Sequence, residues 1–392
     1  MKLSRTFEFF IVVALSLFFT YAYWRYQPQI IAGNGRGWDG IAYHQLYSFY
    51  SGLPVDADVT HPFCKRIGLP FLATLFPLQP TSSFRYLNIV FGFLSISICY
   101  LALRARFSFS VSLAAVVPLC SYLFSPIRFS NFYPYFVDPP ALFLFAVCLA
   151  TLIRKRYYSA FAILLFSAVF RESGLYYALA LSGALYFAKE ISLKKTAFFF
   201  GIVVIVAFSI IFLYFGPCEG SQITVATSTA LAKMGSFAGL LKIIAALSLT
   251  LGPFILVNSK LEIKTYEPIV LVSIVFLILS IVMSSFGGYD TTRIFFSAYP
   301  LYVFYLCSLI QDVAKARIIF FAIAGMIANS FAMKIPEPEH YWPNNEIAGF
   351  FSLFPDYGHI AISAGIIAYW ASCLLIARLI KWGQPAVCSD TK

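Results

Sequence analysis

The sequence predicts an all-α fold: a polytopic membrane bundle of about twelve transmembrane helices, with structured loops on one face. Three observations predict it. Of the 392 residues, 60% are hydrophobic and only 11% are charged, whereas a soluble domain carries about 25% charged residues. The mean hydropathy is +0.81. Finally, the charged gaps between the apolar runs alternate in character along the whole chain.

The gaps alternate between short basic ones and longer aromatic ones of mixed charge. The basic set carries 17 of the 28 Lys and Arg residues and 6 of the 17 Asp and Glu residues, and therefore the whole net charge of +11. The positive-inside rule places this set, with both termini, in the cytoplasm. Such a charge faces anionic lipid headgroups, so it indicates contact with membrane lipids and is no evidence of nucleic-acid binding.

The apolar runs justify the helices in order, because a membrane helix needs about 20 residues, with scatter. The first run starts after basic residues and lacks a small-residue cleavage site, so we interpret it as a retained span. Residues 157–188 are either a hairpin or one helix interrupted at Arg171-Glu172, and we adopt the hairpin because it preserves the charge alternation. The expected spans are 9–24, 87–103, 107–124, 140–153, 157–170, 174–188, 197–215, 237–257, 268–286, 294–310, 318–333 and 360–376.

Residues 1–392 are expected to form one integral membrane domain: a core over about 1–190, later helices over 197–376, and a cytoplasmic tail over 377–392. Two outer loops are long, 25–86 and 334–359. The first contains an apolar stretch at 66–77 that is too short to span, so we expect an interfacial or re-entrant helix there, covering a cavity. Cys64 and Cys218 are the cysteines of the outer loops, and we expect two unpaired thiols rather than a disulfide.

Five clusters of ionisable residues lie at span ends on the outer face, where a charge near lipid is costly unless it is paired or functional. Each one alone has an ordinary explanation: a turn, a side chain that snorkels to headgroups, a helix cap or a local ion pair. The clusters are GWDGIAYHQLY with Asp39, Tyr43 and His44; HPFCKRIGLP with Lys65 and Arg66; RFSNFYPYFVDPP with Asp138; Arg171-Glu172; and GGYDTTR with Asp290 and Arg293.

Their coincidence on one face indicates a common site. A carboxylate can act as general base on a hydroxyl, and Arg or Lys can neutralise a phosphate leaving group in a cleft that excludes water. This combination suits transfer from a phosphate-activated donor carried by a lipid. We expect Asp39 and Asp138 to be catalytic, and Arg66, Lys65, Arg171 and Arg293 to bind the donor phosphate. Tyr43, His44, Glu172 and Asp290 would support them.

The order of these motifs resembles the C-type glycosyltransferase superfamily (GT-C), in its bacterial cell-surface-glycan branch. The resemblance rests on GWDG followed by Tyr43, the Arg66 to Pro70 segment, VDPP with Asp138 and RES with Arg171; it covers about residues 1–190 and, more weakly, GGYDTTR. It implies a multi-pass enzyme of the bacterial inner membrane that moves a hexose or pentose, with inversion, from a polyprenyl-phosphate donor. The acceptor would be a lipid, glycan or protein on the extracytoplasmic face.

The resemblance also assigns roles, with Asp39 at the position of the base or acceptor-orienting group and Asp138 at a second acidic site. No paired acidic residues occur in the first loop, so we expect a metal-independent mechanism without a cofactor. Three alternatives stay open: an O-antigen-type polymerase or ligase, a glycolipid transporter or flippase, and a glycan-binding scaffold. The 26 residues of loop 334–359 hold no Arg, and the chain shows no repeated halves, which disfavours the first two.

Overall fold

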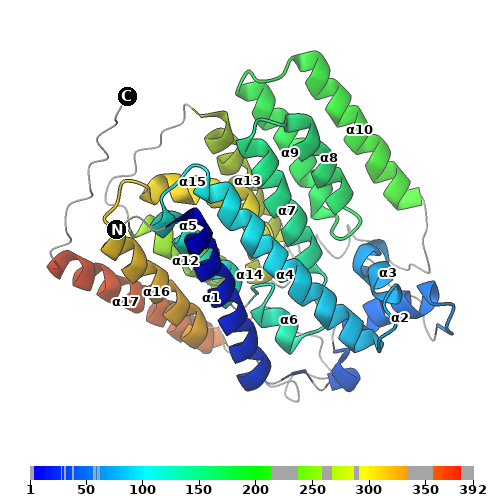
Figure 1. The fold of residues 1–392 in the computed structure, drawn as a ribbon, viewed down its shortest axis with the longest axis horizontal. Coiled ribbons are helices and arrows are strands. Elements are labelled where there is room, and N and C mark those ends of the chain that lie inside the picture. The colour runs from blue at the N-terminus through cyan, green and yellow to red at the C-terminus, as the bar shows by residue number, and fades with distance from the viewer. Residues whose placement is uncertain are drawn as a thin grey trace.

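The computed structural model describes residues 4–27, 29–30, 32–37, 39–55, 59, 62–122, 124–212, 237–257, 267–286, 291–332 and 356–380. Within these ranges the chain is helical and contains no β-strand, as the sequence predicts. Figure 1 shows the helices packed side by side as a bundle, with α2 and α3 gathered at the end of the long helix α4 where that helix begins.

The helices run as follows: α1 (Arg5–Tyr26), α2 (Gly40–Tyr50), α3 (Gly68–Thr74), α4 (Pro80–Arg104), α5 (Phe109–Ser121), α6 (Arg128–Phe132), α7 (Asp138–Ile153), α8 (Tyr157–Ser167), α9 (Ser173–Phe187), α10 (Leu193–Phe212), α12 (Phe237–Ile255), α13 (Pro268–Phe286), α14 (Thr291–Phe296), α15 (Tyr299–Ile310), α16 (Lys315–Ala332) and α17 (Asp356–Leu379). Two short 3₁₀ turns, Ala32–Gly35 and Phe63–Lys65, lie in the first long loop.

Every expected span coincides with a helix except 294–310, which is divided between α14 and α15 with a bend of 77° between them. By length and composition, three of the described helices can cross a membrane, namely α1, α4 and α13, and a fourth if the bent pair counts as one span. Several of the others are short, including α5, α7 and α8. The helices are therefore confirmed, and the number of complete crossings stays a prediction.

The hairpin over 157–188 is confirmed. Tyr158 and Phe161, at the start of α8, contact the ring of Phe199 with centroid distances of 5.5 and 4.2 Å. Phe199 lies in the first part of α10, the helix that follows α9. Because the chain has returned to the start of α8 by this point, α9 must run antiparallel to α8, and the two helices are in contact. A Cβ at Gly174 would lie 2.2 Å from the Ser167 hydroxyl oxygen, so only glycine allows the two helices to approach this closely at the turn. The turn itself presents Arg171 and Glu172.

The first long loop folds onto the beginning of α4. The apolar stretch at 66–77 forms α3, which packs against α2 and α4, so the expected short helix is present. Gly68 of α3 lies against Phe170 of the α8–α9 turn, 2.6 Å from where a Cβ would stand. This contact joins the first loop to the hairpin that carries Arg171 and Glu172.

The expectation of an unpaired thiol at Cys64 is wrong. Cys64 is disulfide-bonded, and its partner lies outside the described residues. The cysteines within the apolar helices are buried free thiols, as their positions indicate: Cys99, Cys120, Cys148, Cys307 and Cys373.

Candidate active site

Asp138 lies at the centre of the site. It is the first residue of α7, where the two following prolines suit the first helical turn, and its side chain is fully buried. Arg171 donates from Nη1 to its Oδ1, and Arg293 donates from Nε to its Oδ2 over 2.8 Å. The α7 helix has no side-chain cap, so Asp138 binds arginines rather than capping its own helix.

Asp39 is joined to this centre through Arg293. Arg293 lies in the short helix α14, and its Nη1 is 3.3 Å from the Oδ2 of Asp39, directly before α2. The guanidinium therefore bridges two carboxylates that are 99 positions apart along the chain. Asp138 is sealed from solvent, whereas the Asp39 side chain is 25% exposed. Of the two, only Asp39 is accessible to a substrate in this arrangement.

Arg66 and Glu172 form the second part of the site. Arg66 donates from Nε and Nη2 to the two oxygens of Glu172 over 2.8 and 2.6 Å, a bidentate geometry, and from Nη1 to the Tyr43 hydroxyl over 3.1 Å. Burial would raise the pKa of Glu172, but the charge and hydrogen bonds of Arg66 outweigh it and lower that pKa to about 2. Burial raises the pKa of Tyr43 to about 12, so Tyr43 stays neutral beside Arg66.

The two parts touch through neighbouring residues of one turn, because Arg171 binds Asp138 while Glu172 binds Arg66. Three arginines and three carboxylates thus converge, contributed by the first loop, the start of α7, the α8–α9 turn and α14. The formal charges of these six described residues cancel. Lys65 adds a further cation at the edge, where burial lowers its pKa and the charge of Glu172 opposes that shift.

The structure brings together most of the residues that the sequence singled out. His44 lies on α2 one turn beyond Asp39, with Nδ1 3.1 Å from the Tyr135 hydroxyl. Asp290 lies outside the described residues. Sequence reasoning missed Thr81 and Arg85 at the beginning of α4. The Thr81 hydroxyl lies 3.2 Å from the Tyr135 hydroxyl. Arg85 could have been found from the sequence as a lone cation beside a predicted span.

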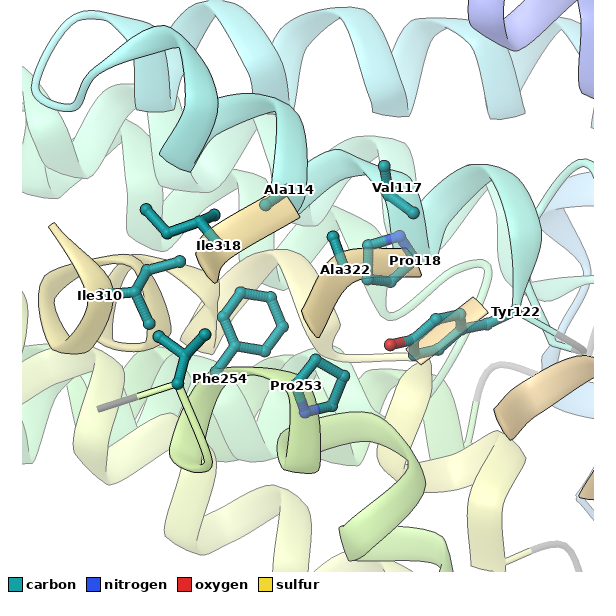
Figure 2. A pocket seen from close by; sticks show the side chains of 10 residues that line it. Ala114, Val117, Pro118, Tyr122, Pro253, Phe254, Ile310, Ile318 and Ala322 are labelled. Carbon is teal, nitrogen blue, oxygen red and sulfur yellow. The ribbon is translucent and has the colours of Figure 1, made fainter. Parts of the chain in front are cut away.

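A cavity between α5, α12, α15 and α16 is separate from this site (Figure 2). Apolar side chains and the Tyr122 ring line it, and its volume of about 10 Å³ is about that needed for one water molecule. It is therefore too small for a sugar. Over the part of the chain that the structure describes, no three His, Cys, Asp or Glu residues are grouped so that they could hold a metal ion.

The chain has a GT-C-like membrane fold, as its similarity to solved structures shows. It is similar to the crystal structure of ArnT from Cupriavidus metallidurans bound to undecaprenyl phosphate, with a TM-score of 0.53 and 12% identity over 95% of this chain and 78% of that chain. It is also similar to the apo state of the same protein, with a TM-score of 0.52 and 12% identity over 93% and 76% of the two chains.

No family model matches the sequence, and no curated protein matches it. At 12% identity the likeness to ArnT concerns the fold. The resemblance drawn from the motifs is thereby confirmed at the level of the fold.

Proposed function

We propose that this protein is a membrane glycosyltransferase that moves a sugar from a polyprenyl-phosphate donor to a hydroxyl of a lipid, glycan or protein acceptor. One observation carries the proposal: a scaffold does not require three arginines and three carboxylates from distant segments in one cluster, because buried charges are costly. The GT-C-like fold supports it, since the ArnT structure of this fold binds undecaprenyl phosphate, a polyprenyl phosphate.

Asp39 is the proposed base, since it is the most exposed carboxylate of the cluster and is held by a single long contact to Arg293, whereas Glu172 is held by a bidentate pair. Asp138 has a narrower role than the catalytic one expected from the sequence. Being sealed and bound to two guanidinium groups, it holds Arg171 and Arg293 in place as a positioning residue. Glu172 does the same for Arg66 through a bidentate pair, and Tyr43 supports Arg66 from the other side.

In the proposed reaction the acceptor hydroxyl gives its proton to Asp39, and its oxygen attacks the anomeric carbon of the donor sugar. The bond from that carbon to the phosphate oxygen breaks, and the electron pair leaves with the phosphate. Arg66, Arg171 and Arg293, with Lys65 at the edge, stabilise the charge that develops there. A single displacement inverts the anomeric configuration. The polyprenyl chain would lie between helices in the bilayer.

The donor phosphate must compete with the carboxylates for these arginines, because their charges already cancel. The contact between Arg293 and Asp39 is the longest in the cluster, at 3.3 Å, and involves its most exposed carboxylate. We propose that the phosphate draws Arg293 from Asp39, which frees Asp39 to accept a proton. Donor binding would then activate the base before the acceptor reacts.

The proposal needs neither a metal nor another cofactor, since guanidinium groups supply the positive charge at the leaving group. This follows from the donor set: each of the three carboxylates is engaged by an arginine. We therefore expect sugar transfer to continue after divalent ions are removed with EDTA. Activity that falls with EDTA and returns with Mg²⁺ or Mn²⁺ would overturn this part of the proposal.

We propose that the site faces the exterior of a bacterial inner membrane, with both termini in the cytoplasm. The Cys64 disulfide supports this, because disulfides persist in oxidising compartments and Cys64 directly precedes Lys65 and Arg66. After mild reduction of intact spheroplasts, a membrane-impermeant maleimide should label Cys64, with the label located by peptide mapping. A Cys64→Ser variant should lose the label from this peptide, although the former partner cysteine still reacts. Labelling of Cys64 only after the membrane is opened would reverse the orientation.

The decisive test is purified protein in nanodiscs with radiolabelled polyprenyl-phosphate sugars, followed for transfer or release of label. Wild type should turn over, and Asp39→Asn should lose about 10²–10⁴-fold in rate, as for a general base. Glu267→Gln is the matched control, because Glu267 is an exposed carboxylate near Arg106 and away from the site. Turnover that persists in Asp39→Asn removes Asp39 from the mechanism, and absence of turnover with every donor favours a transporter or scaffold.

A further inference from the structure

The loop between α6 and α7, residues 133–138, packs against the backbone beside Asp39. Gly40 is the first residue of α2 and follows Asp39 directly. A Cβ on Gly40 would lie 3.0 Å from the Tyr133 hydroxyl oxygen and 3.0 Å from the Cβ of Tyr135. Both tyrosines are buried. The beginning of α2 is therefore in contact with this loop, and the contact leaves no room for a side chain at position 40.

The same loop also holds Arg293. The Arg293 guanidinium lies over the Phe136 ring, 5.1 Å from its centroid, and its Nε donates to Asp138 at the end of the loop over 2.8 Å. Arg293 in turn contacts the carboxylate of Asp39. The loop thus fixes both members of the Asp39–Arg293 contact, one through the backbone next to Asp39 and the other through the guanidinium itself.

A buried amide of α4 fixes the shape of the loop. Asn88 is fully buried, and its Nδ2 donates to the carbonyl oxygens of Pro134 and Phe136 over 2.8 and 2.6 Å. The loop also closes on itself, since the Phe136 backbone N–H donates to the Tyr133 carbonyl oxygen over 3.2 Å. An amide buried in an apolar helix is costly unless it is hydrogen-bonded, and both of these bonds go to the loop. Asn88 therefore joins the loop to α4.

The contact between Asp39 and Arg293 is sensitive to small displacements. At 3.3 Å it already lies at the long end of N–H···O hydrogen bonds, which are usually about 2.7–3.2 Å. Arg293 is held by Phe136 and Asp138 of the loop. A movement of Gly40 away from the loop by a few tenths of an ångström would therefore take Asp39 out of reach of Arg293.

We propose that residues 133–138, held by Asn88, place Asp39 for proton transfer, and that Tyr133 is the positioning residue against which Gly40 is set. The inference rests on the proposed function, in which Asp39 is the base. A base must lie within hydrogen-bond reach of the hydroxyl that it deprotonates. The contacts that place Asp39 are all made within the chain, so the carboxylate is in position before either substrate binds.

The test substitutes Gly40→Ala and follows Asp39 by two measurements. The new Cβ should push α2 away from Tyr133 and Tyr135, which separates Asp39 from Arg293. Modification of Asp39 by a water-soluble carbodiimide, located by peptide mapping, should then become severalfold faster, because the guanidinium no longer shields the carboxylate. The kcat of sugar transfer should fall about tenfold, since misplacement by about 1 Å costs about 10²-fold, while KM for the donor stays unchanged.

The control and the rescue separate positioning from general damage. A Cβ on Gly183 in α9 meets nothing within 4 Å, so Gly183→Ala is the matched control, and both of its readouts should equal those of wild type. Tyr133→Phe removes the hydroxyl that the new methyl group of Gly40→Ala meets. Combining the two changes should recover part of kcat and slow the modification of Asp39. A merely structural loop predicts no recovery, because loss of a second buried contact would only lower the thermal midpoint further.

A second variant keeps the test valid if Gly40→Ala does not fold. Tyr133→Phe alone adds no volume, and without the hydroxyl the start of α2 is less firmly placed. Modification of Asp39 should again be faster and kcat lower, with KM for the donor unchanged.

Unchanged modification of Asp39 in both variants would overturn the proposal, whether or not wild type transfers sugar. Faster modification with unchanged kcat would also overturn it, because Asp39 would then be displaced without effect on the reaction. The modification needs no substrate. Wild type that transfers no sugar, together with faster modification in Gly40→Ala, would therefore reject the proposed function and still support the placement of Asp39 by the loop.

Discussion

Each end of the bundle carries ion pairs around a buried carboxylate, Glu8 at one end and Asp138 at the other, and the two ends differ in how those pairs are connected. At the end where α1 begins and α4 ends, Arg104 donates to both oxygens of Glu8 over 2.6 and 3.2 Å, and Tyr100 adds a third bond. That pair joins two helices and is complete. At the other end, Asp138 pairs with both Arg171 and Arg293, and Arg293 also pairs with Asp39.

The difference teaches that burial and pairing alone do not identify a functional site. The Glu8–Arg104 pair fixes α1 against α4 and leaves no charge to react. The cluster at the other end shares its charges among several segments, and its most exposed carboxylate, Asp39, can be reached by a ligand. Connectivity and access therefore distinguish the two ends, and each of the following experiments tests that distinction.

The largest effect is expected for Arg293→Ala. It removes the bridge between Asp39 and Asp138 and one cation at the leaving phosphate, so the rate of sugar transfer should fall about 10²–10³-fold. Arg104→Ala, the matched change at the other end, should leave the rate per folded molecule unchanged. Equal losses of rate in the two variants would remove the functional distinction between the ends.

A smaller effect is expected on stability at the Glu8 end. Glu8→Gln leaves Arg104 without its charged partner and should cost about 1–3 kcal/mol of unfolding free energy, read as a lower thermal midpoint in detergent. Replacing both partners, by Glu8→Leu with Arg104→Met, should restore the midpoint, because an apolar pair needs no desolvation of charge.

Replacing both partners of an ion pair in the candidate active site, by Arg66→Met with Glu172→Leu, compares this pair with the Glu8–Arg104 pair. It should restore the thermal midpoint relative to Glu172→Leu alone, while sugar transfer stays lost because Arg66 is gone. Recovered transfer in this double variant would show that the Arg66–Glu172 pair is purely structural.

The smallest effect concerns pH. The pKa of Glu172 is about 2 in the folded protein, against an ordinary value of 4.5. The stability that its pairing with Arg66 contributes is therefore fully present above about pH 4.5 and is lost as the pH falls toward 2. The thermal midpoint of wild type should fall more steeply over this interval than that of Glu172→Gln. Parallel curves for the two proteins would contradict the pairing.

The helices were predictable to a large extent. The runs at 9–24 and 268–286 are long and apolar, and they appear as α1 and α13 with bounds extended by at most a few residues. The run at 294–310 is divided by a bend between α14 and α15, which hydropathy does not register, and whether the bent pair makes one crossing stays a prediction. The Cys64 disulfide was missed because pairing of cysteines depends on distance in space, which spacing in the sequence does not give.

The candidate site was predictable as a set and not as a geometry. The motifs indicated Asp39, Arg66, Asp138, Arg171 and Arg293. Charged side chains near lipid raise the free energy of the folded protein, so several of them at span ends on one face indicate a function. The expectation of equal catalytic carboxylates could not distinguish the sealed Asp138 from the part-exposed Asp39. That distinction depends on how α7, α14 and the hairpin turn pack together.

The sequence by itself determined that this is an all-α protein of membrane type and where its helices lie. These properties follow from local composition, since the length of an apolar run and the charge beside it need no tertiary contact. Only the tertiary structure decided which charges meet. Arg293 reaches Asp39 across 254 positions and Asp138 across 155, and such pairs form only when packing brings their helices together and excludes the water that would otherwise solvate them.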